Sequence, residues 1–165
     1  MNQTNTVISA VRGRRNIKSF KPDPIPRELL EELLEAASYA PNHRLTEPWE
    51  ILVVGPATRA LLNHKTNFGG APVVLAILSK PANTQVDRDE YYAATACFIQ
   101  NFMLAAWEKG IGTGWSSLGL SKHAREVLQI EPGYEVVGLI PVGYPAEVPE
   151  AKPRTAIGQK IRELS

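Results

Sequence analysis

The sequence contains a single cysteine and no long uninterrupted apolar segment. Only Cys97 among its 165 residues carries a thiol, so the chain cannot form an internal disulfide. The start, MNQTNT, lacks the apolar core of a secretory signal, and together these two features favour a cytoplasmic protein. The longest apolar run, residues 93–107, is interrupted by polar side chains and is shorter than the ~20 residues that cross a bilayer. It therefore predicts a buried helix and no membrane association.

The chain also has little net charge. Eighteen Lys and Arg residues oppose seventeen Asp and Glu residues, which gives a net charge of +1. Such a chain has no global basic field to attract nucleic acid or anionic lipid, so any anion site has to be local. With 44% hydrophobic residues, no repeat and no recognisable linker, residues 1–165 are predicted to form a single domain with a substantial core.

Clusters of metal-ligating or nucleophilic side chains are lacking as well. The three histidines, His43, His64 and His123, are scattered without the spacing of metal ligands. Cys97 falls within the apolar helix, where we expect a small core residue and not a nucleophile. The sequence therefore predicts no metal site and gives no candidate for a catalytic triad.

Hydrophobic periodicity indicates alternating helices and strands. Thr6 is placed to cap a short helix that ends near Gly13, and Ser121 to cap another that reaches Leu128. Further helices are expected before Pro41 and at 87–109, and strands at 50–55, 72–78 and 135–145. The first two strands have the continuous apolar character of strands buried on both faces. This pattern is a sheet with helices on its faces, of α/β or α+β type.

The stretch VRGRRNIKSF concentrates positive charge in an otherwise nearly neutral chain, and it has two interpretations. In the first, the arginines lie near the C-terminal end of a helix, where cations interact favourably with the helix dipole by ~0.3 to 1 kcal/mol. In the second, the cluster converges on a phosphate, which accepts forked guanidinium hydrogen bonds well. The residues involved would then be Arg14, Arg15, Asn16 and Lys18. Taken alone, the cluster favours the first interpretation.

Five segments in order resemble the FMN-dependent nitroreductase family, and they span nearly the whole chain. The first, RRNIKSF, is similar to the family's N-terminal signature. The others are APNHRLTEPWEILVV, APVVLAIL, AATACFIQNFMLAAWEKGIGTGW and GLIPVGYPAEVPEAKPR. The compact length is similar to that of the smaller family members. The resemblance implies an α+β fold in which helices flank a mixed, mainly antiparallel central sheet.

The resemblance also supplies the anion, which is the 5′-phosphate of FMN. It implies that Arg14, Arg15 and Asn16 hold phosphate and ribityl oxygens, although Asn16 stands where the family usually has Ser. Lys18 would lie beside the ribityl chain or the pyrimidine edge of the flavin. Arg154, in AKPR, matches the C-terminal basic position that closes the phosphate site.

Two further segments would frame the flavin ring. By the resemblance, His43 contacts the flavin from the partner subunit. The loop of Trp115, Ser116 and Ser117 lies near the isoalloxazine, where backbone groups and small hydroxyls bond its polar edge. For Trp115 the alternative of simple packing stays open, and Trp49 is expected in the core.

The resemblance implies an oxidoreductase activity with a ping-pong catalytic cycle. NAD(P)H as co-substrate would pass hydride to flavin N5 and leave, and a nitroaromatic, quinone or related small-molecule electron acceptor would follow. No side chain is required as acid or base. Family members place FMN at the interface of a homodimer, and the apolar helix at 93–107 independently fits such an interface.

Two alternatives belong to other functional classes. One is an FMN-binding protein or a specialised flavoenzyme without nitroreductase turnover, which would have the same phosphate residues. The other is a non-flavin interaction protein whose basic segment binds an acidic partner, with binding that weakens gradually as salt increases.

Overall fold

The computed structural model describes residues 7–164. Segments whose apolar residues recur with helical spacing form helices in it. The helices are α1 (Val7–Gly13), α2 (Arg27–Ala37), α3 (Pro56–Leu61), α4 (Gln85–Glu108) and α5 (Lys122–Val127). The Ser121 hydroxyl accepts the Ala124 N–H at 3.1 Å, which confirms the predicted cap of α5. The other predicted cap, Thr6, lies outside the described residues. Helix α3 was not predicted; it begins with proline at its first position, a common helix start.

The strands form one four-stranded sheet with the order β1-β2-β4-β3. They are β1 (Trp49–Val53), β2 (Val73–Ser79), β3 (Gly112–Thr113) and β4 (Glu135–Gly143). All three strand pairs are antiparallel. A single parallel bridge joins Asn16 to Thr113 and adds the N-terminal segment to the β3 edge. The expected mixed, mainly antiparallel sheet with flanking helices is confirmed.

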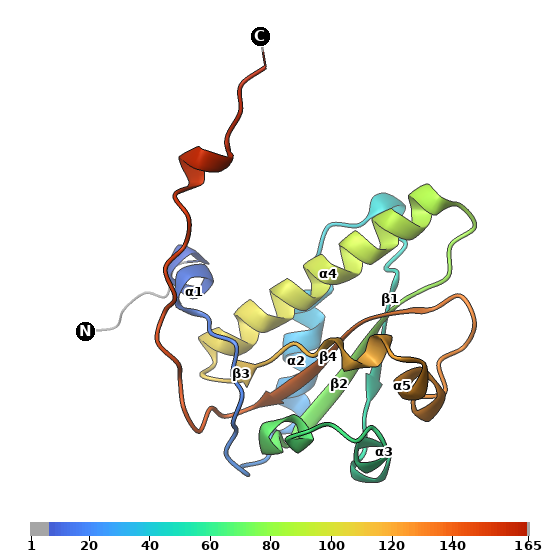
Figure 1. The fold of residues 1–165 in the computed structure, drawn as a ribbon, viewed down its shortest axis with the longest axis vertical. Coiled ribbons are helices and arrows are strands. Elements are labelled where there is room, and N and C mark those ends of the chain that lie inside the picture. Colours follow the sequence, from blue (N-terminus) through green and yellow to red (C-terminus); the bar gives the residue numbers. More distant parts are fainter. Residues whose placement is uncertain (1–6, 165) are drawn as a thin grey trace.

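Helices cover both faces of the sheet and enclose two hydrophobic cores (Figure 1). On one face, α2 and α4 contribute Leu33 and Phe98, and Trp49 stacks on the Phe98 ring with centroids 5.0 Å apart. Trp49 is thus a core residue, as predicted. On the other face, Phe68 and Leu128 belong to the second core, with α3 and α5 outside it.

Two predictions about burial are wrong. β1 lies at the edge of the sheet, and its residues are half-buried on average, with Val53 exposed; of the two strands predicted to be buried on both faces, β2 alone is. Cys97 is exposed, because α4 turns Phe98 and Phe102 toward the sheet and leaves its opposite face to solvent. Since α4 is apolar almost all round, periodicity does not indicate which side faces the sheet.

Within residues 7–164, three short 3₁₀ helices lie between these elements and a fourth follows β4: η1 (His43–Leu45), η2 (Asn67–Gly70), η3 (Ser117–Leu120) and η4 (Ile157–Lys160). Beyond Pro145 the chain leaves the sheet, and residues 146–164 are exposed throughout. Figure 1 shows this tail passing α1 and then extending away from the rest of the chain. Within residues 7–164, no helix has the length and apolar character needed to cross a membrane.

Candidate functional site

The basic N-terminal segment and the Gly-rich loop after β3 are held together by main-chain pairing. Ile17 N–H donates to the Thr113 carbonyl at 2.9 Å, next to the Asn16–Thr113 bridge. The Asn16 side chain then reaches along the same edge, where its Oδ1 accepts the Trp115 N–H at 3.2 Å. This pairing places the predicted phosphate residues directly beside the predicted ring loop.

Three arginines lie near enough to one another at this edge for their charges to interact. Arg14 is half-buried; burial lowers its pKa most strongly, and the neighbouring charges of Arg154 and Arg15 lower it further. Arg154 arrives from the C-terminal tail, far away in sequence. Among the described residues, none of these three arginines forms an ion pair with a carboxylate. The result is a local concentration of uncompensated positive charge in a nearly neutral chain.

Arg15 is turned toward the end of α1. Its Nη1 donates to the carbonyls of Arg12, Gly13 and Arg14 at 2.9, 2.8 and 3.0 Å, while its buried Nε has no hydrogen-bond partner. Arg15 therefore fits the helix-end interpretation of the basic cluster. Arg14, which makes no such contact among the described residues, is the arginine left available for a ligand.

The Trp115 ring lies against the sheet and is still 41% exposed. Its Nε1–H donates to the Val137 carbonyl at 3.2 Å, and a Cβ on Gly138 would lie 2.5 Å from that nitrogen. Glycine at this position is therefore what lets the indole lie flat on β4. The indole therefore packs on β4, as the packing alternative expects, while part of the residue stays exposed.

The two serines of this loop differ in their roles. Ser116 N–H donates to the Leu139 carbonyl at 2.9 Å, and its hydroxyl accepts the Leu118 N–H at 3.3 Å, which caps η3. Ser117 is exposed and begins η3. The backbone bond fixes the loop on β4, so the position of its polar groups is set by the sheet.

Lys18 and His43 lie outside this cluster. Lys18 is exposed, two residues past Asn16 along the same segment. His43 is exposed in η1, beside the N-terminal end of α4, whereas α1 lies at the C-terminal end of that helix (Figure 1). Since α4 has 24 residues and is about 36 Å long, His43 and Arg14 are far apart within one chain.

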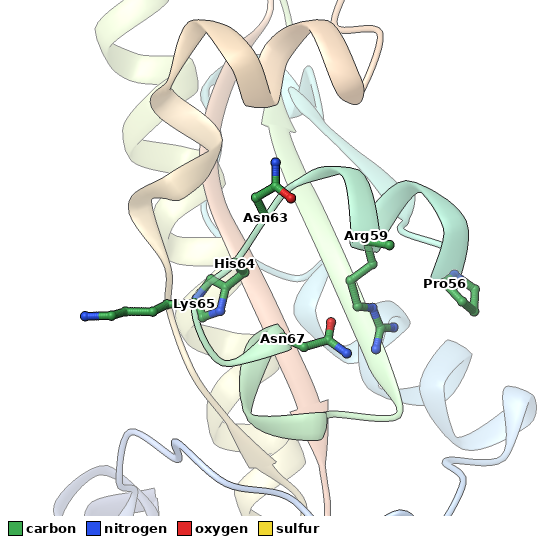
Figure 2. Close-up of a pocket in the computed structure, with 7 residues that line it drawn as sticks. Pro56, Arg59, Asn63, His64, Lys65 and Asn67 are labelled. Atoms are coloured by element: carbon green, nitrogen blue, oxygen red, sulfur yellow. The ribbon is translucent and has the colours of Figure 1, made fainter.

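A second polar region was missed by the sequence reasoning. A surface cavity of ≈ 470 Å³ lies between α3 and η2, and its polar lining comes from Arg59 and the stretch Asn63–Asn67 (Figure 2). The available signal was the polar, Gly-terminated run NHKTNFGG. Within residues 7–164, no group of three or more His, Cys, Asp or Glu side chains is arranged to hold a metal ion.

The fold and the basic cluster define the class of protein: an α+β domain with a local concentration of positive charge at the edge of its sheet. Residues 11–67 and 57–144 match the Nitroreductase family, and the chain belongs to that family. It is 32% identical to a Bacillus subtilis (strain 168) protein named "Putative NAD(P)H nitroreductase YfhC", over 99% of this chain and 97% of the relative. As a family member the protein is an oxidoreductase.

Solved structures share the same fold. A nitroreductase-like family protein from Bacillus cereus is 30% identical and superposes with a TM-score of 0.89, covering 99% of this chain and 98% of the other. The NADPH:FMN oxidoreductase from Vibrio harveyi, solved with NAD⁺, is 18% identical with a TM-score of 0.85, covering 96% and 77%. The second likeness concerns the fold alone.

Proposed function

We propose that the protein is an FMN-dependent oxidoreductase that transfers hydride from NAD(P)H to nitroaromatic, quinone or related small-molecule acceptors. Family membership and the name of the Bacillus subtilis relative support the reaction class. The observation that carries the cofactor is the half-buried Arg14 beside Arg154, without a carboxylate partner among the described residues. Like charges at short distance destabilise the folded chain unless an anion lies between them.

The donors at this edge fit a phosphate. Arg14 and Arg154 supply the charge, and guanidinium groups bind phosphate oxygens in a forked geometry. Because Asn16 Oδ1 accepts the Trp115 N–H, the Nδ2 group is the end of this amide that is left to donate to a ligand. Two arginines that supply charge and an amide whose Nδ2 is left to donate would together bind a phosphate ester such as FMN.

When bound, FMN supplies the hydride chemistry, and the protein contributes binding, orientation and access. Arg14, Arg154 and Asn16 would hold the phosphate and ribityl end, and the Trp115–Ser117 loop would meet the polar edge of the ring. Arg15 would contribute by fixing the end of α1 through its three carbonyl contacts. None of these groups acts as acid or base in the proposal, so proton delivery is left to solvent.

The direct test is a visible absorbance spectrum of the protein after FMN is added and the excess is removed by desalting. We expect retained flavin bands at about one FMN per chain, bleaching with NADH or NADPH, and recovery on addition of menadione or nitrofurazone. A colourless protein would refute the proposal and favour a basic segment that binds another anion. Retained flavin that no acceptor reoxidises would instead indicate a flavin-binding protein without this turnover.

We further propose a homodimer with FMN at its interface, which would bring the partner subunit's His43 segment to the flavin. Three segments within residues 7–164 carry exposed apolar side chains. Helix α1 has no buried residue, and its Val7, Ile8 and Val11 are exposed. The exposed face of α4 carries Ala93 and Cys97, and the exposed tail 146–164 carries Val148 and Ile157. A second copy would cover these surfaces, since large apolar patches on soluble proteins mark interaction sites.

The interface prediction can be tested at Cys97. In Cys97→Arg a charge enters the middle of the exposed α4 face, and we expect the protein to shift from dimer to monomer in light scattering. Cys97→Ser changes size little and adds no charge, so it should remain dimeric. A wild-type protein that is monomeric and still retains flavin would contradict the dimer while leaving the FMN proposal in place.

A further inference from the structure

The cavity between α3 and η2 has an unusual polar lining, because every polar side chain in it can donate a hydrogen bond and none is acidic. These side chains are Arg59, Asn63, His64, Lys65 and Asn67. The volume of ≈ 470 Å³ falls within the ~300 to 1,000 Å³ typical of small-molecule sites. The cavity shares no lining residue with the basic site around Arg14, so it is a separate feature of the molecule.

Arg59 is held in place by main-chain carbonyls and not by a carboxylate. Its Nη1 donates to the Ala71 carbonyl at 2.6 Å, and its Nη2 lies 3.5 Å from the Val54 carbonyl. Its Nε is buried without a hydrogen-bond partner, and burial lowers the pKa of the guanidinium. No ion pair involves Arg59 in the part of the chain that the structure describes. The cation is thus fixed in position without a compensating charge.

Asn67 presents its amide to the same space. Figure 2 shows the Asn67 amide pointing toward the Arg59 guanidinium, whereas the Lys65 ammonium points away from both. Within residues 7–164 the Asn63 and Asn67 side chains make no hydrogen bond that would occupy them. Asn67 has φ +45°, a left-handed conformation that asparagine tolerates better than most residues. The backbone therefore holds this amide at the cavity wall.

His64 adds a neutral donor. Its Nδ1 accepts the N–H groups of Phe68 at 3.0 Å and Thr66 at 3.3 Å, and its ring stacks on Phe68 with centroids 4.1 Å apart. Because Nδ1 is an acceptor, the proton of the neutral ring lies on Nε2. Burial lowers the pKa of His64, which favours this neutral form. Arg59 is then the fixed charge of the cavity.

We propose that this cavity binds a small molecule through an oxyanion group, a phosphate or a carboxylate, with Arg59 as charge partner and Asn67 as directional donor. Phosphate and carboxylate share the acceptor geometry that such donors recognise. The absence of an acidic side chain from the lining excludes a preference for cations. None of the residues that line the cavity belongs to the proposed FMN site.

The test is a titration of the FMN-saturated protein with inorganic phosphate and, separately, with acetate, at constant ionic strength. Amide ¹H–¹⁵N signals of His64 and Asn67 report on the cavity, while those of Arg14 and Asn16 report on the basic site. We expect saturable shifts at the cavity amides. Because these signals are separate, a failure to bind FMN and a failure to bind anion in the cavity are distinguishable.

Two variants of Asn67 sharpen this test. Asn67→Asp keeps the shape and the tolerated backbone conformation but faces the anion with a like charge, and we expect affinity to fall about tenfold or more. Asn67→Gly fits the left-handed φ and removes the amide, with an expected loss of about fivefold. The matched control is Asn83→Asp, the same charge change on an exposed loop at the other end of β2.

The response to the two anions identifies the group that the cavity binds. Saturation by phosphate alone assigns a phosphorylated ligand, saturation by acetate alone assigns a carboxylate, and saturation by both supports the shared chemistry. Absence of saturable shifts with either anion overturns the proposal. Shifts that Asn67→Asp and Asn67→Gly leave unchanged, or that Asn83→Asp weakens equally, also overturn it because the binding then lies elsewhere.

Discussion

Arg14→Ala should weaken FMN binding by roughly 10- to 100-fold, the equivalent of about 1.5 to 3 kcal/mol for a hydrogen bond to a charged group. Arg14 is half-buried and, unlike Arg15, its side chain makes no hydrogen bond to the carbonyls at the end of α1, so its loss removes charge from the proposed phosphate position. Fluorescence titration of FMN with the purified variant measures the change in Kd.

Arg12→Ala is the matched control for this prediction. It removes the same charge from an exposed position two residues away, and the Arg12 carbonyl that Arg15 contacts is retained. We expect its FMN affinity to change little. Equal weakening in both variants would mean that only the general positive charge of the segment matters, which favours the acidic-partner alternative.

Gly69→Ala should give the largest loss of stability. Gly69 has φ +67°, and an added Cβ would collide with the main chain of Lys18, with the carbonyl carbon only 2.7 Å away. Backbone atoms cannot move aside like a flexible side chain. The Phe20 N–H also donates to the Gly69 carbonyl at 3.0 Å, so the collision separates two paired segments. We expect the free energy of unfolding to fall by about 3 kcal/mol or more, measured by urea denaturation.

Gly70→Ala separates the two causes of this loss. Gly70 also has positive φ, +73°, but an added Cβ meets no atom within 4 Å. Its cost is therefore the backbone strain alone, about 1 kcal/mol. If the two variants lose similar amounts of unfolding free energy, backbone strain at positive φ is the main cause. The close contact between η2 and Lys18 would then contribute little to stability. Gly69→Ala should also weaken FMN binding, since Lys18 continues the segment that carries Arg14 and Asn16.

Apart from α3, the helices and the buried strands β2 and β4 could be predicted because their signals are local. The spacing of Leu30, Leu33 and Ala37 shows one buried face of α2, and a hydroxyl at Ser121 marks the start of α5. The apolar runs of β2 and β4 indicate buried strands. The order of five segments along the chain indicates the family. Each of these patterns involves residues that are close together in the sequence, so the sequence is sufficient to predict the corresponding helix or strand.

The division of roles within the basic cluster could not be read from the sequence. Arg15 makes the contacts of the helix-end interpretation, whereas the phosphate interpretation is our proposal for Arg14; the difference between them depends on side-chain direction at the end of α1. The exposure of Cys97 likewise depends on which side of an apolar helix meets the sheet. Hydrophobic periodicity predicts neither the direction of a charged side chain at a helix end nor which side of an apolar helix meets the sheet. Both depend on contacts with residues that are distant in the sequence.

The local elements, the small net charge and the resemblance to a flavin-using family all follow from the order of residues along the chain. Which cations lie near one another follows from the folded chain, because the tail that returns past α1 brings Arg154 near Arg14. The folded chain also leaves Arg59 without a carboxylate beside it in the cavity. Electrostatic interactions depend on distance through space, and the distance between residues far apart along the chain is set by packing of the whole fold.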